Sequence, residues 1–238
     1  MTQHRGPTTA EALLARVMTT PDAYPQKLDL VRESCLVIEL TESAYRAASF
    51  LDDRILGPAT RGGWLPFDRV LDAAQRVADL RPLHFIFHTG HVGSTLVSRL
   101  LDETGAVLSL REPLPLRTLA DAHDVLRHPE SLLSPARFDE LLTGQLRLWS
   151  RGYASTRCVV VKATSSAARL APTILARGGT RAIYLNQRAE SAIATLLAGQ
   201  NSPLDLRGHG PGRMQRLCDG SAARSRRCTR CRSASLPP

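Results

Sequence analysis

The sequence contains only two lysines, Lys27 and Lys162, although it carries 31 basic residues and a formal net charge of +9. It also lacks any apolar run that approaches the roughly 18 residues of a membrane span. The first residues, MTQHRGPTTAEALLARV, lack the apolar segment of a secretory signal. These absences predict a cytoplasmic protein with no membrane partner.

Cysteine is scarce as well, with five residues in 238. Cys35 and Cys158 stand inside apolar runs, which is typical of reduced, buried thiols rather than of a disulfide framework. The Cys228–Cys231 pair has CxxC spacing but no second pair of ligands, and His123 and His128 show no metal-ligand spacing. The sequence therefore predicts no metal site.

Positive charge is concentrated at one end of the chain. From Arg207 onward there are eight arginines against one acid, Asp219, so this stretch carries +7, and residues 1–206 carry only +2. An affinity for nucleic acid or other polyanions is therefore expected from the tail alone. The body of the chain is not basic.

Length and composition predict one main domain, because 238 residues with 43% hydrophobic residues suffice for a substantial core. We expect three segments: an N-terminal, mainly helical arm at 1–80, an α/β core at 81–206, and a basic, disordered tail at 207–238. Helical periodicity marks 8–18, 43–55 and 67–80 in the arm. The run CLVIEL at 35–40 fits either a strand or a buried helical turn.

Residues 83–113 form the central motif of the chain. The apolar run LHFIF at 83–87 is typical of a strand buried on both faces. The loop HTGHVGST at 88–95 interrupts it, and a helix follows. In that helix an apolar face is predicted from spacing. Its residues are Leu96, Val97, Leu100 and Leu101.

The loop has the properties of an anion site. Gly90 and Gly93 permit positive φ and leave the backbone amides uncovered, and Ser94 and Thr95 add hydroxyl donors where the helix begins. Compared with a G-x-x-x-x-G-K-[ST] loop, His88 stands at the first glycine and Ser94 at the lysine. The spacing is thus that of a degenerate phosphate-binding loop, and an ordinary glycine turn without a ligand remains the alternative.

Two further polar residues follow apolar strands. Glu112 comes directly after AVLSLR, at a strand end where open α/β sheets bind ligands, and is a candidate general base. The alternatives are that Glu112 pairs with Arg111 or caps the helix after Pro113. Lys162 ends the strand CVVVK and is a candidate phosphate contact, although a solvated strand end fits equally well.

Strands and helices alternate through the rest of the core, as in βαβ units. Strands are predicted at 83–87, 106–110, 158–164 and 181–185, and helices at 114–126, 135–149, 167–176 and 189–198. This alternation predicts an α/β fold with a doubly wound, mostly parallel sheet flanked by helices.

The core resembles the P-loop sulfotransferases, through FHTGHVGSTLVSRLLD, LSLREP, VVVKAT and AIYLNQRAESAIATLLAG, in this order, over roughly residues 83–206. The resemblance implies that 3′-phosphoadenosine 5′-phosphosulfate (PAPS) is the sulfuryl donor and that no metal takes part. It places the 5′-phosphosulfate on the loop. The residues implied there are Gly90, His91, Gly93, Ser94 and Thr95.

The resemblance also implies roles for residues outside the loop. The family's 3′-phosphate contacts fall at Gln187 and Thr195, with Arg188 one position late. Glu112 corresponds to the general base of some members, and His88 takes the place of a basic residue near the loop start. Lys162 and His88 would then stabilise the leaving phosphate while a small-molecule hydroxyl or amine accepts the sulfuryl group.

Two other functions stay open at this stage. A P-loop nucleotide kinase or NTPase would need a loop lysine and a carboxylate for Mg²⁺ after an apolar strand, and neither is evident. A non-enzymatic, nucleotide-binding homologue with a nucleic-acid-binding tail is the second.

The tail changes composition abruptly after HGPGRMQRL, where CDGSAARSRRCTRCRSASLPP is rich in Arg, Ser, Cys and Ala. This is the composition that a GC-rich gene gives when read in a shifted frame. We therefore expect a frame-shifted or truncated end, with impaired activity, because sulfotransferases commonly close the nucleotide site with a basic loop near the C-terminus. Resequencing the locus tests this, since an intact reading frame with the same end would refute it.

Overall fold

The computed structural model describes residues 9–199 and, beyond them, residues 204, 207, 208, 210–212, 214, 215, 217 and 218. The chain divides into two compact units, Met1–Asn186 and Gln187–Pro238, and each is described by itself. Among the described residues, no helix is long and apolar enough to cross a membrane. The pair Cys228–Cys231 and most of the predicted basic tail lie outside the described residues.

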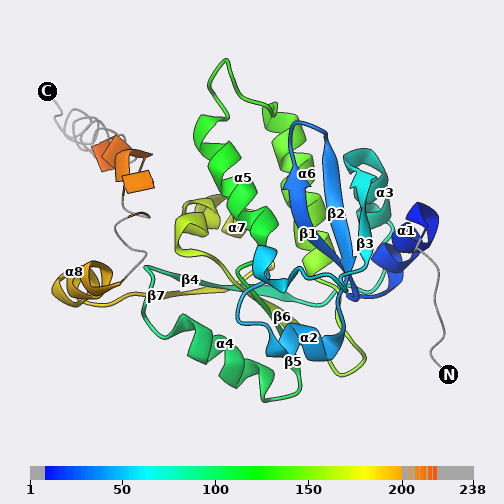
Figure 1. Ribbon diagram of the computed structural model, residues 1–238, viewed down its shortest axis with the longest axis horizontal. Helices are drawn as coiled ribbons and strands as arrows, with labels where there is room; N and C mark the ends of the chain where they lie inside the picture. The colour runs from blue at the N-terminus through cyan, green and yellow to red at the C-terminus, as the bar shows by residue number, and fades with distance from the viewer. Residues whose placement is uncertain are drawn as a thin grey trace, which may run out of the picture. The chain divides into compact units, whose positions relative to one another are not determined.

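A four-stranded parallel sheet forms the centre of the first unit (Figure 1). Its strand order is β5-β6-β4-β7, and every neighbouring pair is parallel. The strands are β4 (Leu83–His88), β5 (Val107–Arg111), β6 (Cys158–Lys162) and β7 (Ala182–Leu185). The apolar runs predicted as strands account for this sheet. The strands β4, β5 and β6 are largely buried, which continuous apolar sequence favours, whereas β7 is an edge strand and mostly exposed.

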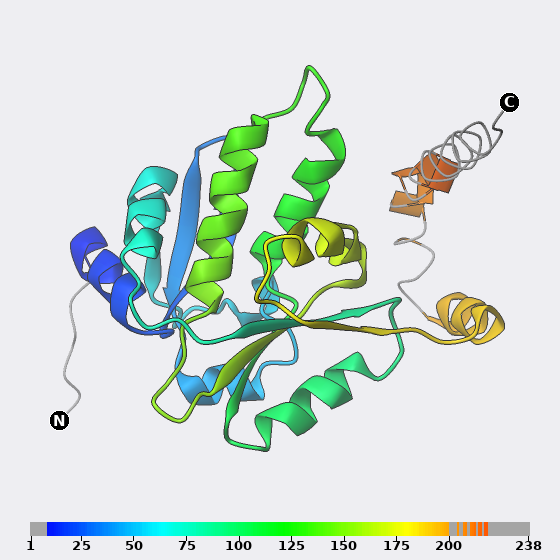
Figure 2. The ribbon, with the colours of Figure 1, turned by 180° about the vertical axis from the view of Figure 1, so that it is seen from behind.

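Helices cover both faces of this sheet (Figures 1 and 2). One face carries α4 (Ser94–Asp102), and the other carries α5 (Leu114–Val125), the 3-10 helix η2 (Ser165–Leu170) and α7 (Ala171–Leu175). The long helix α6 (Pro135–Trp149) begins at a Ser134 cap. The prediction of an α/β fold with a parallel sheet flanked by helices is therefore confirmed.

The orientation of α4 differs from the prediction. Its exposed residues include Leu96 (62% exposed) and Leu100 (59%), which were predicted to form a core-facing stripe. Its buried residues are instead Ser94, Ser98 and Asp102. The polar face turns inward because β5 presents polar partners there. They are the backbone N–H and hydroxyl of Ser109 and the guanidinium of Arg111.

The first 80 residues contain more than the mainly helical arm that was predicted. They contain a three-stranded antiparallel sheet in the order β1-β2-β3. Its strands are β1 (Ala23–Asp29), β2 (Ser34–Glu39) and β3 (Gly62–Pro66), and the helical segments are α1 (Ala10–Thr19), α2 (Glu42–Ala47), the 3-10 helix η1 (Asp53–Ile55) and α3 (Phe67–Gln75). The run CLVIEL is a strand. Pro25 is tolerated in β1 because that strand lies at the sheet edge and has an irregular register there.

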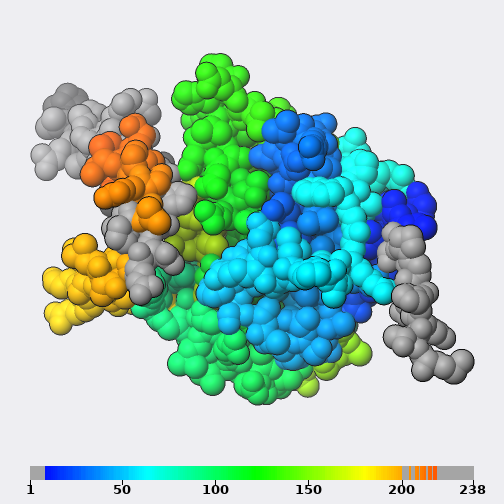
Figure 3. All heavy atoms as spheres, in the orientation of Figure 1, coloured from blue at the N-terminus to red at the C-terminus, as the bar shows by residue number. Residues whose placement is uncertain are grey.

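One hydrophobic core joins this arm to the parallel sheet. Buried Arg151, after α6, donates hydrogen bonds to the carbonyls of Val17, Thr20 and Ala23 in the arm. In the space-filling view the blue and cyan atoms of the arm pack directly against the green atoms that follow (Figure 3). The predicted segment boundaries after residues 80 and 206 remain predictions.

Candidate oxyanion site at the end of the parallel sheet

The glycine loop joins β4 to α4 and has an unusual backbone. Gly90, His91 and Gly93 have φ values of 94°, 52° and 75°. A Cβ atom added at Gly90 or Gly93 would meet no other atom within 4 Å, so glycine is needed there for conformation and not for packing. Gly93 caps α4, buried Ser94 begins the helix, and Thr95 follows half-buried. The loop therefore leads directly into the N-terminus of a nine-residue helix.

His88 ends β4 and is 5% exposed. Its Nδ1 accepts a hydrogen bond of 2.9 Å from the backbone N–H of Gly90, while its Nε2 is buried and has no hydrogen-bond partner among the described residues. Burial lowers the pKa of His88 to about 4. The positive charge of Lys162 and the neighbouring His91 act in the same direction, and the backbone of Ala163 opposes them. The ring is thus neutral at physiological pH.

Glu112 and Lys162 form an ion pair at the ends of adjacent strands. The Nζ of Lys162 donates to Oε1 of Glu112, and the N–H of Glu112 donates to the carbonyl of Lys162 at 2.6 Å. Glu112 has φ 53°, a backbone conformation that costs on the order of 1–3 kcal/mol for a residue other than glycine. Oε1 lies 3.9 Å from His88 Nε2, so three residues from distant parts of the sequence meet at one point.

Glu112 makes neither of the two other contacts predicted for it, an ion pair with Arg111 or a cap on the helix after Pro113. Arg111 pairs with Asp102 instead of Glu112. The helix after Pro113 has no side-chain cap hydrogen bond. Lys162 likewise is not a solvated strand end, since it is 1% exposed. Both polar residues are therefore held within the site by each other.

Two arm residues border the site and were missed in the sequence. The ring of Phe50 has Lys162 Nζ at 5.5 Å and Arg54 Cζ at 3.6 Å from its centroid. Arg54 also pairs with Asp52, which raises the pKa of Arg54, and Glu112 adds to this effect at longer range. No local pattern marks Phe50, because its partner Lys162 is more than a hundred positions away.

Arg111 of β5 forms hydrogen bonds that attach residues 45–51 of the arm to the parallel sheet. Its fully buried guanidinium donates to the carbonyls of Tyr45, Arg46 and Ala48 and pairs with Asp102. Its own carbonyl accepts a bond from the N–H of residue 51 at 2.7 Å. The segment that carries Phe50 is thus held at the end of β5.

The remaining predicted contacts lie in the second unit. Arg188 precedes α8 (Ala189–Ala198), and the hydroxyl of Thr195 donates to the carbonyl of Ser191 at 2.8 Å. Their predicted contact with a 3′-phosphate remains a prediction.

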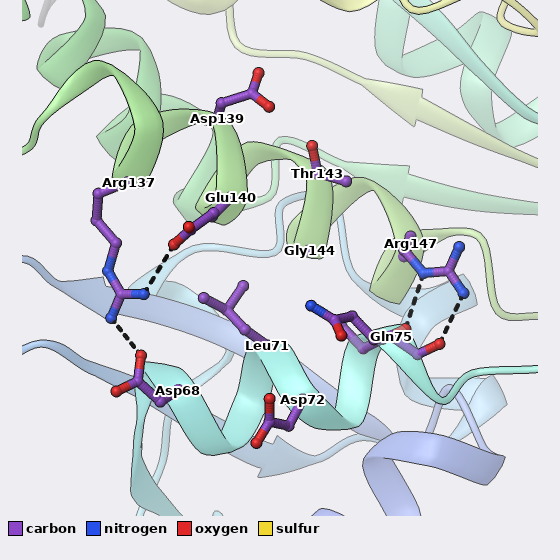
Figure 4. A pocket seen from close by; sticks show the side chains of 11 residues that line it. Asp68, Leu71, Asp72, Gln75, Arg137, Asp139, Glu140, Thr143, Gly144 and Arg147 are labelled. Carbon is purple, nitrogen blue, oxygen red and sulfur yellow. Dashed lines mark hydrogen bonds and ion pairs between the residues drawn. The ribbon is translucent and has the colours of Figure 1, made fainter.

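A separate cavity of about 390 Å³ lies between α3 and α6 (Figure 4). Arg137 pairs there with Asp68 and Glu140. Arg147 donates to backbone carbonyls at the end of α3. Since these charged groups already have partners within the cavity wall, we assign them to the attachment of the two helices.

Among the described residues there is no group of three or more His, Cys, Asp or Glu side chains that could hold a metal ion. Comparison of the chain with protein-family models, with curated proteins and with solved structures gives no match.

Proposed function

We propose that the chain binds PAPS at the glycine loop and transfers its sulfuryl group to a hydroxyl or amine of a small-molecule acceptor. The observation that supports this most is the meeting of His88, Glu112 and Lys162 beside the loop. The three residues come from separate strands and supply a donor, an acceptor and a positive charge. Those are the groups that transfer between two oxygens requires.

The residues fit an oxyanion ligand in two respects. The buried Nε2 of His88 is an unused polar atom next to the loop, and such atoms are rare in folded proteins. Gly90 and Gly93 have open space on the side where a Cβ would point, so no side chain at these two positions stands between the loop and a ligand. Helix N-termini of this kind favour negatively charged groups.

The proposed reaction uses the groups as follows. PAPS supplies an activated sulfuryl group, and an oxygen or nitrogen of the acceptor forms a bond to sulfur as the bond from sulfur to the 5′-phosphate oxygen breaks. Glu112 takes the acceptor proton. Lys162 and His88 donate hydrogen bonds to the phosphate oxygen that receives the electron pair. When Lys162 donates to that oxyanion, its hydrogen bond to Glu112 weakens. Oε1 of Glu112 can then accept the proton of the acceptor group.

Calorimetric titration with 3′-phosphoadenosine 5′-phosphate, the product of the donor, tests this proposal. We expect binding of this bisphosphate without added metal, and weaker binding of ATP with Mg²⁺. Ser94→Ala, at the start of α4, should reduce affinity for the bisphosphate, whereas Ser131→Ala, in the loop before α6, should not. Preference for ATP with Mg²⁺ would instead favour a nucleotide kinase or NTPase, and binding of neither nucleotide would refute both.

A further inference from the structure

The tautomer of His88 follows from its hydrogen bond to the loop. The backbone N–H of Gly90 donates to Nδ1 at 2.9 Å, so Nδ1 carries a lone pair and no proton. A neutral imidazole has one proton, which must then be on Nε2. His88 therefore presents an N–H donor, and not a lone pair, beside Glu112 and Lys162.

Among the described residues this donor makes no hydrogen bond, although the backbone of Ala163 interacts with the ring and raises its pKa. Nε2 is buried without a hydrogen-bond partner among the described residues, and the carboxylate oxygen of Glu112 is 3.9 Å away and bonded to Lys162. A buried N–H without a partner costs free energy unless a ligand satisfies it. The missing group is thus an acceptor atom.

We propose that His88 is a neutral hydrogen-bond donor of fixed tautomer, which binds an unprotonated oxygen of a sulfuryl or phosphoryl group at the loop through Nε2–H. It is neither the cationic substitute for a loop lysine nor a general base. This inference specifies how the site of the proposed function recognises its ligand and rests on that function for the identity of the nucleotide. The positive charge at the site then comes from Lys162.

Several groups around the ring keep it neutral. Lys162 from β6 faces it with a positive charge, His91 from the loop adds to this, and the desolvation of the strand end disfavours a further charge. Glu112 and the backbone of Ala163 are the groups that favour protonation. Protonation would also occupy Nδ1 and break the bond from Gly90, so an imidazolium ring would be incompatible with this loop conformation.

Nitrogen-15 NMR of the full chain tests the tautomer directly, with the His88 signals assigned by their loss in His88→Asn. We expect the chemical shift of an unprotonated nitrogen at Nδ1 and of a protonated one at Nε2, unchanged from about pH 8 to about pH 5, where an ordinary histidine titrates. Inorganic sulfate, which carries no proton in this range, should shift the Nε2 signal and leave the tautomer unchanged. A proton on Nδ1, titration in this range or imidazolium formation with sulfate would overturn the proposal.

A pair of variants tests the donor itself. In His88→Asn the amide oxygen can still accept the bond from Gly90, but the Nε2 donor is lost. We expect sulfate affinity to fall about tenfold, as for a lost hydrogen bond to a charged group. His84→Asn is the matched control, because His84 lies on the same strand and its Nδ1 accepts a backbone N–H at Arg181. Unchanged sulfate binding in His88→Asn would overturn the proposal.

The two proposals can fail separately. If sulfate binds with the expected Nε2 shift but 3′-phosphoadenosine 5′-phosphate does not bind, the nucleotide assignment is wrong and the role of His88 stands. If the bisphosphate binds equally well to the wild type and to His88→Asn, the function stands and the role of His88 is refuted.

Discussion

The Nζ of Lys162 donates to the carboxylate of Glu112 across the ends of two neighbouring parallel strands, and the backbone N–H of Glu112 returns a bond to the carbonyl of Lys162. The two residues are 50 positions apart in the sequence. Each alone had an ordinary explanation as a strand-end residue. Their reciprocal pairing beside the glycine loop makes them one structural unit.

Loss of one partner of this buried ion pair should destabilise the fold more than loss of one partner of a surface ion pair. Lys162→Met leaves Glu112 without its partner, and we expect a loss of about 3 kcal/mol in the free energy of unfolding. The other lysine is the natural control. Lys27→Met removes an exposed pair with Asp53 and should cost less than about 1 kcal/mol. Urea unfolding of both variants measures this, and equal losses would contradict the account.

The positive φ of Glu112 predicts that Glu112→Gly is more stable than Glu112→Ala, which is the reverse of the usual order. Glu112→Gly and Glu112→Ala both remove the carboxylate, but only glycine adopts φ 53° without strain. We therefore expect the glycine variant to be more stable, by about 1 kcal/mol. At an ordinary position alanine would be the more stable of the two. Thermal unfolding of the pair decides it, and a more stable alanine variant would show that the position is not strained.

Stability should depend on pH through His88. Its pKa is about 4 in the folded chain and near 6.5 when unfolded, so the unfolded state binds more protons between these values. The free energy of unfolding should therefore fall as the pH drops from about 6.5 to about 4, with about 3 kcal/mol from this residue. His88→Asn should flatten this part of the profile, whereas His84→Asn should leave it steep. Parallel profiles for wild type and His88→Asn would contradict the assignment.

The attachment of the arm should depend on the shape of the Arg111 side chain and not only on its charge. Arg111→Lys keeps one positive charge for Asp102 but cannot also reach the three arm carbonyls, so we expect a loss of about 3 kcal/mol. Arg117→Lys, on the exposed face of α5, should change stability by less than about 0.5 kcal/mol. Equal stability of the two variants in urea would show that the hydrogen bonds of Arg111 to the arm do not stabilise the fold.

Much of the parallel sheet was predictable because three of its strands, β4, β5 and β6, are largely buried. Runs such as LHFIF and CVVVK are mostly apolar, with one polar residue in each, and each is followed by glycine or polar residues that end the strand. The boundaries of α6 (Pro135–Trp149) and α8 (Ala189–Ala198) also followed from periodicity. A helix or strand can be predicted from its own residues where those residues determine its structure.

The errors arose where long-range contacts decide the structure. Leu96 and Leu100 of α4 are exposed because Asp102 of the same helix bonds to Arg111 and Ser109, which helical periodicity does not reveal. The first strand of the arm, β1, includes several polar residues, Pro25 and an irregular register, so its sequence does not resemble a strand. Phe50 reaches the site only because Arg111 holds its segment there.

The most direct test of the account is calorimetric titration of the wild type, Lys162→Met and Lys27→Met with 3′-phosphoadenosine 5′-phosphate. The account predicts binding by the wild type and by Lys27→Met, and an affinity at least about tenfold lower for Lys162→Met, since a charge-assisted hydrogen bond to phosphate is lost. Equal affinity in all three proteins, or no binding by the wild type, would contradict a sulfuryl-donor site at this loop.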